Sequence, residues 1–231
     1  MKEKFEGHPG KRRIPSGILY ILGSAFYRIF FNVRIEGTEN IPNEGPLLIL
    51  SKHSSYHDIP LGYSVLTRAS GKRNDFWCVM KDALASPIFM GFFLKCGGVP
   101  INRENPEKSK SQLILARKVL HAGNMLGIFP EQTRVPGKMG RGKEAGFRFV
   151  MGKPKEKVAV VCLGISYEKG FLRKKATLKI GKVHFFQSGM DASQFFHERM
   201  VEMGELSGFS YNFPPPKKKE GTGNETTKSS V

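Results

Sequence analysis

The sequence predicts an α/β fold: one domain with a mixed, partly parallel central sheet flanked by helices and preceded by an amphipathic, apolar N-terminal helix. Short apolar runs typical of buried strands alternate with longer segments whose apolar residues recur at helical spacing. The chain has 231 residues, of which 39% are hydrophobic and 25% charged. This composition suits a domain of roughly 200 residues with its own core, and it excludes a disordered chain or a polytopic membrane protein.

The first predicted element is the N-terminal helix. Ile14 to Tyr27 is an uncharged stretch of 14 residues, which as a helix is ~21 Å long against ~30 Å of bilayer hydrocarbon. Apolar residues cover a broad face and basic residues flank it, which suits a helix lying in a membrane interface. Packing into a protein core is the alternative. We expect residues 1–31 to be a basic start with this interface helix, 32–213 the folded domain and 214–231 a disordered basic tail.

The predicted strands follow in order, each a short apolar run bounded by turn residues. They lie at residues 32–37, 46–50, 76–80, 98–101, 125–129, 158–165 and 177–183. Asn, Pro and Gly between positions 39 and 46 separate the first strand from the second. Pro130 ends the fifth.

Helical patterns lie between the later strands. Residues 106–122 carry Leu113, Ala116 and Leu120 at helical spacing, and residues 141–152 give a weaker pattern. Asp191-Ala-Ser-Gln resembles a capping box that begins a helix through about residue 205. Strands that alternate with helices predict a partly parallel sheet.

The chain is strongly basic, with 37 Lys and Arg against 20 Asp and Glu and a net charge of +17. The first 13 residues carry +3 and residues 214–231 carry +2, so +12 remains on the body. A basic folded surface predicts anionic partners, such as phospholipid headgroups, an acidic carrier protein, phosphorylated substrates or nucleic acid.

No sequence pattern indicates a metal or a nucleotide cofactor. The three cysteines have no CxxC spacing, and HExxH, GxxxxGK[ST] and GxGxxG motifs are absent. We therefore expect no metal, no cofactor and a reducing compartment. Gly164 to Glu168 lacks the second glycine of a nucleophile elbow, which disfavours a serine hydrolase. Because no helix-turn-helix or aromatic RNA-binding signature occurs, no nucleic acid is expected as a partner.

His53 and Asp58 are the candidate catalytic residues. His53 directly follows the predicted strand 46–50, and functional groups of α/β folds gather where loops leave the carboxyl ends of strands. If Asp58 lies in the first turn of the next helix, its carboxylate can hold one ring nitrogen and leave the other as a general base. No catalytic serine is needed if the substrate brings its own hydroxyl. A loop histidine beside a helix-capping aspartate is the alternative.

Two further segments present arginines at strand ends. Phe129 to Arg134 places an acid, a hydroxyl and an arginine on one loop, and Gly97 to Arg103 ends in another arginine. A guanidinium offers a planar fork of donors suited to phosphate. Together with the His–Asp pair, these residues are what acyl transfer to a phosphate-bearing alcohol needs.

In these motifs the chain resembles the glycerophospholipid acyltransferases of the 1-acyl-sn-glycerol-3-phosphate acyltransferase type. Four blocks match in order over about residues 30–185: the His-x4-Asp block at 53–58, the arginine-ending block at 101–103, the Phe-Pro-Glu-Gly-Thr-Arg block at 129–134 and a fourth apolar block at 158–166. Two departures stand out. Gln132 replaces the family's usual Gly, and Lys52 replaces the usual Asn before the histidine.

The resemblance implies an O-acyltransferase in which His53 is the base and Asp58 orients it. It implies an acyl-CoA or acyl-carrier-protein donor and a lysophospholipid acceptor, most directly 1-acyl-sn-glycerol-3-phosphate, which gives phosphatidic acid. Substrate binding is implied for Arg103, Glu131, Thr133, Arg134 and Lys143.

Alternatives to this interpretation stay open. The acceptor could be another lysolipid, such as a lyso-ornithine lipid, and a non-catalytic basic protein that binds membranes or nucleic acid fits the charge alone. For the enzyme we expect a peripheral or monotopic location on the cytoplasmic face of a membrane, with an anionic membrane surface as a partner.

Overall fold

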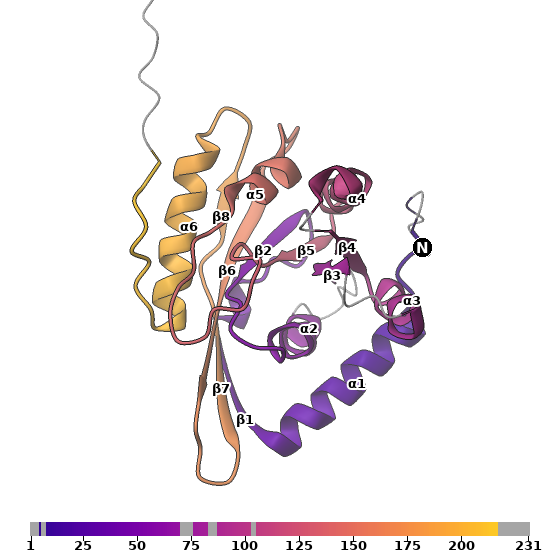
Figure 1. Ribbon diagram of the computed structural model, residues 1–231, viewed down its shortest axis with the longest axis vertical. Coiled ribbons are helices and arrows are strands. Elements are labelled where there is room, and N and C mark those ends of the chain that lie inside the picture. The colour runs from indigo at the N-terminus through magenta and orange to yellow at the C-terminus, as the bar shows by residue number, and fades with distance from the viewer. Residues whose placement is uncertain (1–4, 6–7, 70–75, 83–86, 103–104, 217–231) are drawn as a thin grey trace, which may run out of the picture.

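A mixed sheet of eight strands, within the part of the chain that the structure describes, lies at the centre of the molecule (Figure 1). The computed structural model describes residues 5, 8–69, 76–82, 87–102 and 105–216. The strand order is β1-β7-β6-β2-β5-β3-β4, and β8 pairs with β6. The bounds are β1 Phe31–Glu36, β2 Leu47–Ser51, β3 Phe76–Lys81, β4 Gly98–Ile101, β5 Met125–Ile128, β6 Val158–Glu168, β7 Lys174–Ile180 and β8 His184–Phe186.

Helices cover both faces of this sheet (Figure 1). Helices α1 and α2 lie on one face, and α4, α5 and α6 pack on the other. Their bounds are α1 Arg13–Phe30, α2 Asp58–Ala69, α3 Pro87–Lys95, α4 Lys110–His121, α5 Glu144–Met151 and α6 Ala192–Ser207. The predicted α/β fold with an N-terminal helix is confirmed.

Strand β2 shows why the central strands are continuous apolar runs. Leu47 and Ile49 belong to the core beneath α1 and α2, whereas Leu48 and Leu50 belong to the core beneath α4, α5 and α6. All five residues of β2 are buried. A strand covered on both faces has no solvent side, so its sequence does not alternate.

The register of β2 with its two neighbours decides what gathers at its carboxyl end. Leu50 pairs with Ile128 of β5 and Ser51 pairs with Leu163 of β6, and both pairings are parallel. The segments that follow β2 and β5 therefore leave the sheet side by side. Strand β6 continues past this edge to Glu168 and returns as β7, so the β6–β7 hairpin, with β1 paired along the other side of β7, projects beyond it.

The end of the sheet differs from the sequence prediction. Strand β6 extends to Glu168 rather than residue 165, and β7 begins at Lys174 rather than residue 177. The reason is antiparallel pairing, which runs from Leu163 opposite Ile180 out to Glu168 opposite Lys175 and fixes both strands together. Strand β7 ends at Ile180, before the predicted end at residue 183. The chain then forms a separate strand, β8, which pairs with the other end of β6.

Helix α1 packs one side against α2 and leaves the other side open. Gly23 permits the close approach, since a Cβ there would lie 2.8 Å from Ser64 Oγ. Among the described helices, none is both long and apolar enough to cross a bilayer. The outer side of α1 exposes large apolar residues, with 41–77% of their surface accessible: Ile14, Ile18, Ile21, Leu22, Phe26, Ile29 and Phe30.

Candidate active site

His53 and Asp58 form a hydrogen-bonded pair at the carboxyl end of β2. His53 Nδ1 donates to Asp58 Oδ2 at 2.9 Å, and Asp58 is the first residue of α2. The Asp58 side chain is fully buried, whereas the His53 side chain keeps 12% of its surface exposed. Because a carboxylate only accepts, the proton sits on Nδ1, and Nε2 is the nitrogen left to take a proton.

The Asp58 carboxylate is held by four donors. Oδ2 also accepts from the backbone N–H groups of Ser54 at 2.6 Å and Ser55 at 2.7 Å. Oδ1 accepts from the Tyr167 hydroxyl at 2.7 Å. Burial, together with the neighbouring Asp58 charge, raises the pKa of Tyr167, so this hydroxyl keeps its proton and donates. The network fixes the carboxylate and, through it, the His53 ring.

Tyr167 is a site residue that the sequence did not reveal. It lies two residues beyond the predicted end of its strand, in the part of β6 that pairs with β7. No motif marks it. The extension of the β6–β7 hairpin is what brings it to the carboxylate.

A buried ion pair lies directly beneath His53. Lys52 Nζ donates to both oxygens of Glu131 at 2.9 Å, and neither side chain has exposed surface. Glu131 also accepts from the His53 backbone N–H at 2.9 Å and from Gly140 N–H at 2.6 Å. Lys52 donates further to the carbonyls of Val135 at 2.7 Å and His53 at 3.2 Å.

This environment changes the role assigned to Glu131. The family resemblance implies that it binds substrate. In the structure its carboxylate is enclosed and faces three protein donors, so it holds the His53 backbone rather than a substrate. Lys52, noted in the sequence as a departure from the family, is the counter-charge that makes this burial possible.

The loop after β5 is fastened to the loop after β2. Val135 N–H donates to the His53 carbonyl at 2.8 Å, and the Phe129 ring lies 4.4 Å, centroid to centroid, from the His53 ring. Gln132 has a φ of +58°, the left-handed conformation that glycine adopts most easily. The loop therefore keeps the backbone conformation expected of the family's glycine, although a side chain is present.

Thr133 and Arg134 are exposed on this same loop. The Arg134 guanidinium lies 3.4 Å from the ring centroid of Tyr56, which belongs to the segment between His53 and Asp58. This cation–π contact places a cationic, accessible group over the catalytic segment. Lys143 is also exposed, and its backbone N–H donates to Pro130 O at 2.8 Å at the base of the loop.

The structure does not place every predicted site residue. Arg103 lies outside the described residues. The preceding strand, β4, ends at Ile101 beside β3.

Among the described residues, no three His, Cys, Asp or Glu side chains gather as metal ligands.

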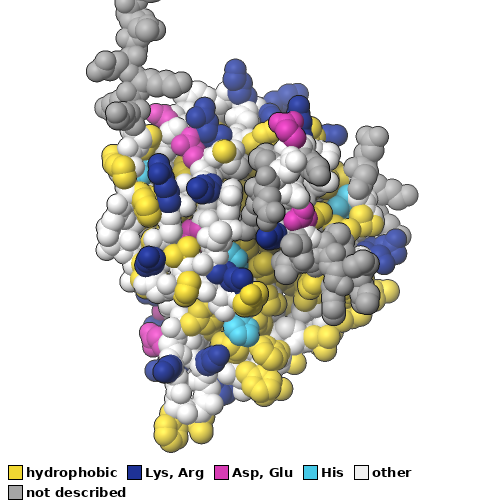
Figure 2. All heavy atoms as spheres, in the orientation of Figure 1, with side chains coloured by type: hydrophobic (Ala, Val, Ile, Leu, Met, Phe, Trp, Pro, Cys, Tyr) yellow, Lys and Arg dark blue, Asp and Glu magenta, His cyan; other side chains and the backbone are white. Residues whose placement is uncertain are grey.

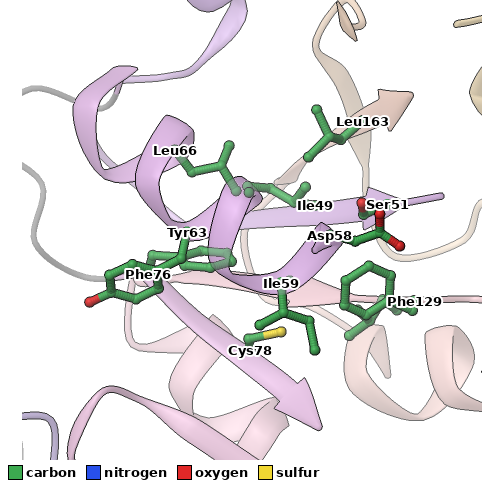
Figure 3. Close-up of a pocket in the computed structure, with 13 residues that line it drawn as sticks. Ile49, Ser51, Asp58, Ile59, Tyr63, Leu66, Phe76, Cys78, Phe129 and Leu163 are labelled. Atoms are coloured by element: carbon green, nitrogen blue, oxygen red, sulfur yellow. The ribbon is translucent and has the colours of Figure 1, made fainter. Parts of the chain in front are cut away.

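A narrow, largely apolar cavity of about 20 Å³ leads inward from the site between α2 and the sheet. Figure 3 shows Ser51, Asp58 and Phe129 at one end and Tyr63 and Phe76 at the other. A space of this size holds about one water molecule. In this conformation it is therefore too small for an acyl chain.

The model of the acyltransferase family matches residues 32–166, more than half of the chain. The chain belongs to the acyltransferase family. The matched range contains the His53–Asp58 pair, the Lys52–Glu131 pair and Arg134.

Two curated relatives carry more specific names. The chain is 30% identical over 142 residues to the chloroplastic 1-acyl-sn-glycerol-3-phosphate acyltransferase LPAT1 of Arabidopsis thaliana, covering 60% of this chain and 38% of the relative. It is 32% identical over 104 residues to the 1-acyl-sn-glycerol-3-phosphate acyltransferase of Bacillus subtilis, covering 44% and 48%. The matches thus span less than half of each relative's length.

The fold of this member of the family is also similar to that of a solved structure. The crystal structure of the 1-acyl-sn-glycerophosphate (LPA) acyltransferase PlsC from Thermotoga maritima matches with a TM-score of 0.62 and 21% identity. The match covers 84% of this chain and 77% of the other. The two proteins share the α/β architecture.

Proposed function

We propose that this acyltransferase moves a fatty acyl group from an acyl thioester to the free hydroxyl of 1-acyl-sn-glycerol-3-phosphate. The observation that carries the proposal is the His53–Asp58 pair, in which a buried carboxylate holds Nδ1 of a partly exposed imidazole and leaves Nε2 as the nitrogen that can take a proton. The names of the two curated relatives support lysophosphatidic acid as the acceptor. The donor is acyl-CoA or an acyl-carrier protein.

The reaction follows from this geometry. His53 Nε2 takes the proton of the acceptor hydroxyl as its oxygen attacks the thioester carbonyl, and Asp58 stabilises the resulting imidazolium. The tetrahedral intermediate then collapses and the C–S bond breaks. The departing thiolate takes the proton from Nε2, so the products are an ester and a free thiol. No serine is acylated, because the acceptor supplies the nucleophilic oxygen.

Arg134 is the residue that we propose for the acceptor phosphate. Its guanidinium is accessible and lies against Tyr56, inside the catalytic segment. A planar fork binds phosphate through two parallel hydrogen bonds, which an ammonium group cannot reproduce. Thr133, Lys143 and Arg103 stay proposals as further contacts to the substrate.

We also propose a peripheral or monotopic location on the cytoplasmic face of a membrane. The apolar outer side of α1 and the excess of basic residues support it, since a helix of this kind lies in an anionic interface. A lysolipid acceptor resides in the same interface.

The test is transfer of radiolabelled palmitoyl from palmitoyl-CoA and, separately, from palmitoyl-carrier protein to lysophosphatidic acid in detergent micelles. Loss of a positioned base lowers the rate by about 10²- to 10⁴-fold, so His53→Ala should fall by that factor. His197→Ala, on α6 and packed beside Tyr211, is the matched control and should keep full rate.

Arg134→Lys separates acceptor binding from chemistry. It should raise KM for lysophosphatidic acid by about 10-fold with little change in KM for the donor. Full activity of His53→Ala would refute the mechanism, and an unchanged acceptor KM would refute the phosphate assignment. Absence of product with lysophosphatidic acid, but product with lyso-ornithine lipid, would replace the acceptor while keeping the reaction.

A further inference from the structure

The tip of the β6–β7 hairpin presents two large apolar side chains to solvent. Phe171 is 101% exposed and Leu172 is 88% exposed, so neither packs against the protein. Single exposed apolar residues are ordinary, but an adjacent Phe and Leu at the end of a projecting hairpin form a compact apolar point. Nothing in the catalytic geometry requires it.

Basic residues surround this point. Lys169, Arg173, Lys174 and Lys175 are all exposed, and Glu168 is the one acidic residue between positions 168 and 175. An apolar tip with a basic collar is complementary to an anionic bilayer, in which acyl chains lie below negatively charged headgroups. An aqueous partner surface offers no such layering.

The tip lies on the same side of the molecule as the apolar face of α1. Arg173 Nη1 donates to the Arg28 carbonyl in the last turn of α1 at 2.9 Å, and Lys174 pairs with Phe31 across β7 and β1. Beside this junction α1 exposes Ile29 and Phe30. Figure 2 shows hydrophobic side chains along α1 and again at the end of the hairpin, with basic side chains between them.

The hairpin also connects the tip to the catalytic pair. Tyr167 donates to Asp58, and Phe171 follows four residues further along the chain. Because β6 ends at Glu168 and the chain then turns, ~3.3 Å per residue is an upper limit, and the tip lies at most roughly 13 Å beyond Tyr167. Insertion by ~5–10 Å, as is usual for interfacial elements, would hold Tyr167 at about the level of the headgroups.

We propose that Phe171 and Leu172 form a membrane-inserting tip that, together with the outer face of α1, docks the enzyme on an anionic phospholipid bilayer with its catalytic site over the headgroups. The inference deepens the proposed function and takes from it only that the substrates are lipids. Docking itself requires no catalysis, so the two can be tested separately.

Insertion of the tip into lipid is measured by the tryptophan fluorescence of the Phe171→Trp variant of the full chain. The native Trp77 is 2% exposed and reports a constant signal, so any change comes from the new indole. With vesicles of 30% phosphatidylglycerol and 70% phosphatidylcholine, its emission should shift to shorter wavelength and be quenched by brominated acyl chains. Phe185→Trp, at a half-exposed position on β8 at the opposite end of β6, should show neither effect.

Binding is measured by sedimentation with the same vesicles. The double variant Phe171→Ser/Leu172→Ser removes two side chains from the inserted surface and should weaken partitioning by about 30-fold or more. Phe185→Ser should bind like the wild type. Because Phe171 and Leu172 are almost fully exposed, thermal unfolding of the double variant should be unchanged, and Phe185→Ser, which loses a contact with Lys157 Nζ, should lower Tm only slightly.

The outcomes distinguish the possible binding partners of the tip. An unshifted Phe171→Trp emission on vesicles that bind the protein, or wild-type partitioning of the double variant, would overturn the proposal. A shift that grows with protein concentration without lipid would assign the tip to a second copy of the chain. Loss of transfer from carrier protein alone, with vesicle binding intact, would assign it to donor docking.

Activity distinguishes failure of this inference from failure of the proposed function. With a short-chain lysophosphatidic acid dissolved below its critical micelle concentration, the double variant should retain the wild-type rate. Its rate on acceptor embedded in anionic vesicles should fall in parallel with binding. If the wild type shows no transfer at all but binds vesicles through the tip, the proposed function fails while the docking surface stands.

Discussion

The Lys52–Glu131 pair makes a sharp test of how the site is held. Removal of one partner leaves the other as a charge without exposed surface. Lys52→Met takes away the cation that contacts both Glu131 oxygens and also the donor to the Val135 carbonyl. Glu131→Gln keeps the shape but leaves Lys52 beside a neutral amide. It also weakens the acceptor of the His53 backbone N–H.

The expected cost is large for the single changes and smaller for the pair. Breaking a buried ion pair from one side costs about 3–5 kcal/mol, because an uncompensated charge stays buried. For a domain of this size each kcal/mol lowers Tm by roughly 2–4 °C, so either variant should unfold about 6–20 °C earlier. The double variant Lys52→Met/Glu131→Gln should be less destabilised than the sum, since it buries no charge.

The assay is urea denaturation of the wild type, both single variants and the double variant, combined into a double-mutant cycle. Acyl transfer, measured well below the lowest Tm, should show a lower kcat, since the His53 backbone loses part of its anchor. Arg34→Met, which breaks an exposed pair with Glu36, is the control and should cost at most about 1 kcal/mol. Single variants that each cost less than about 1 kcal/mol, with additive effects in the double variant, would show that the Lys52–Glu131 pair does not stabilise this site.

Three further predictions concern single side chains. Tyr167→Phe removes a hydrogen bond to the Asp58 carboxylate, so steady-state kinetics should show kcat lower by about 10-fold with an unchanged acceptor KM. Gln132→Gly relieves a left-handed backbone that costs a non-glycine residue about 1 kcal/mol, so Tm and activity should be unchanged or higher, whereas Gln132→Val should lower Tm. Burial lowers the pKa of His8 and His57 below the ordinary value of 6.5. As the pH falls, these histidines are therefore protonated in the unfolded chain before they are protonated in the folded protein. The free energy of unfolding, measured by urea titration, should fall as the pH drops below 6.5. His8→Gln/His57→Gln should flatten that slope, and an identical slope would contradict this account.

The sequence predicted most of the fold because its signals are local. The buried run at 46–50, the strand ending at Pro130 and the helix capped by Asp191 each carry their own pattern, and Asp191 accepts from Ser193 and Gln194 N–H groups as the cap requires. The spacing of five residues across a strand-to-helix loop allowed the His53–Asp58 hydrogen bond as one of two interpretations, and the structure has it at 2.9 Å.

What the sequence did not reveal depends on contacts between distant segments. Lys52 and Glu131 are 79 residues apart, and only the parallel pairing of β2 with β5 brings them together. In the sequence, Lys52 is noted only as a departure from the family pattern, and the resemblance implies substrate binding for Glu131, so neither residue indicates the other as its partner. The predicted bounds of β7 were wrong for the same reason. Pairing with β6, and not local composition, decides that the strand begins at Lys174.

One feature of the topology connects chemistry with docking. The register of β6 with β2 ends at Leu163, which pairs with Ser51, and from there to Glu168 β6 pairs with β7. This extension places Tyr167 on Asp58 and carries Phe171 outward on the same two strands. A bilayer that holds the tip therefore constrains the strand that holds the carboxylate. If the tip inserts as proposed, the length of the hairpin sets the distance between the lipid surface and His53, and the lysolipid has to rise far enough for its glycerol hydroxyl, which lies below the phosphate, to meet Nε2.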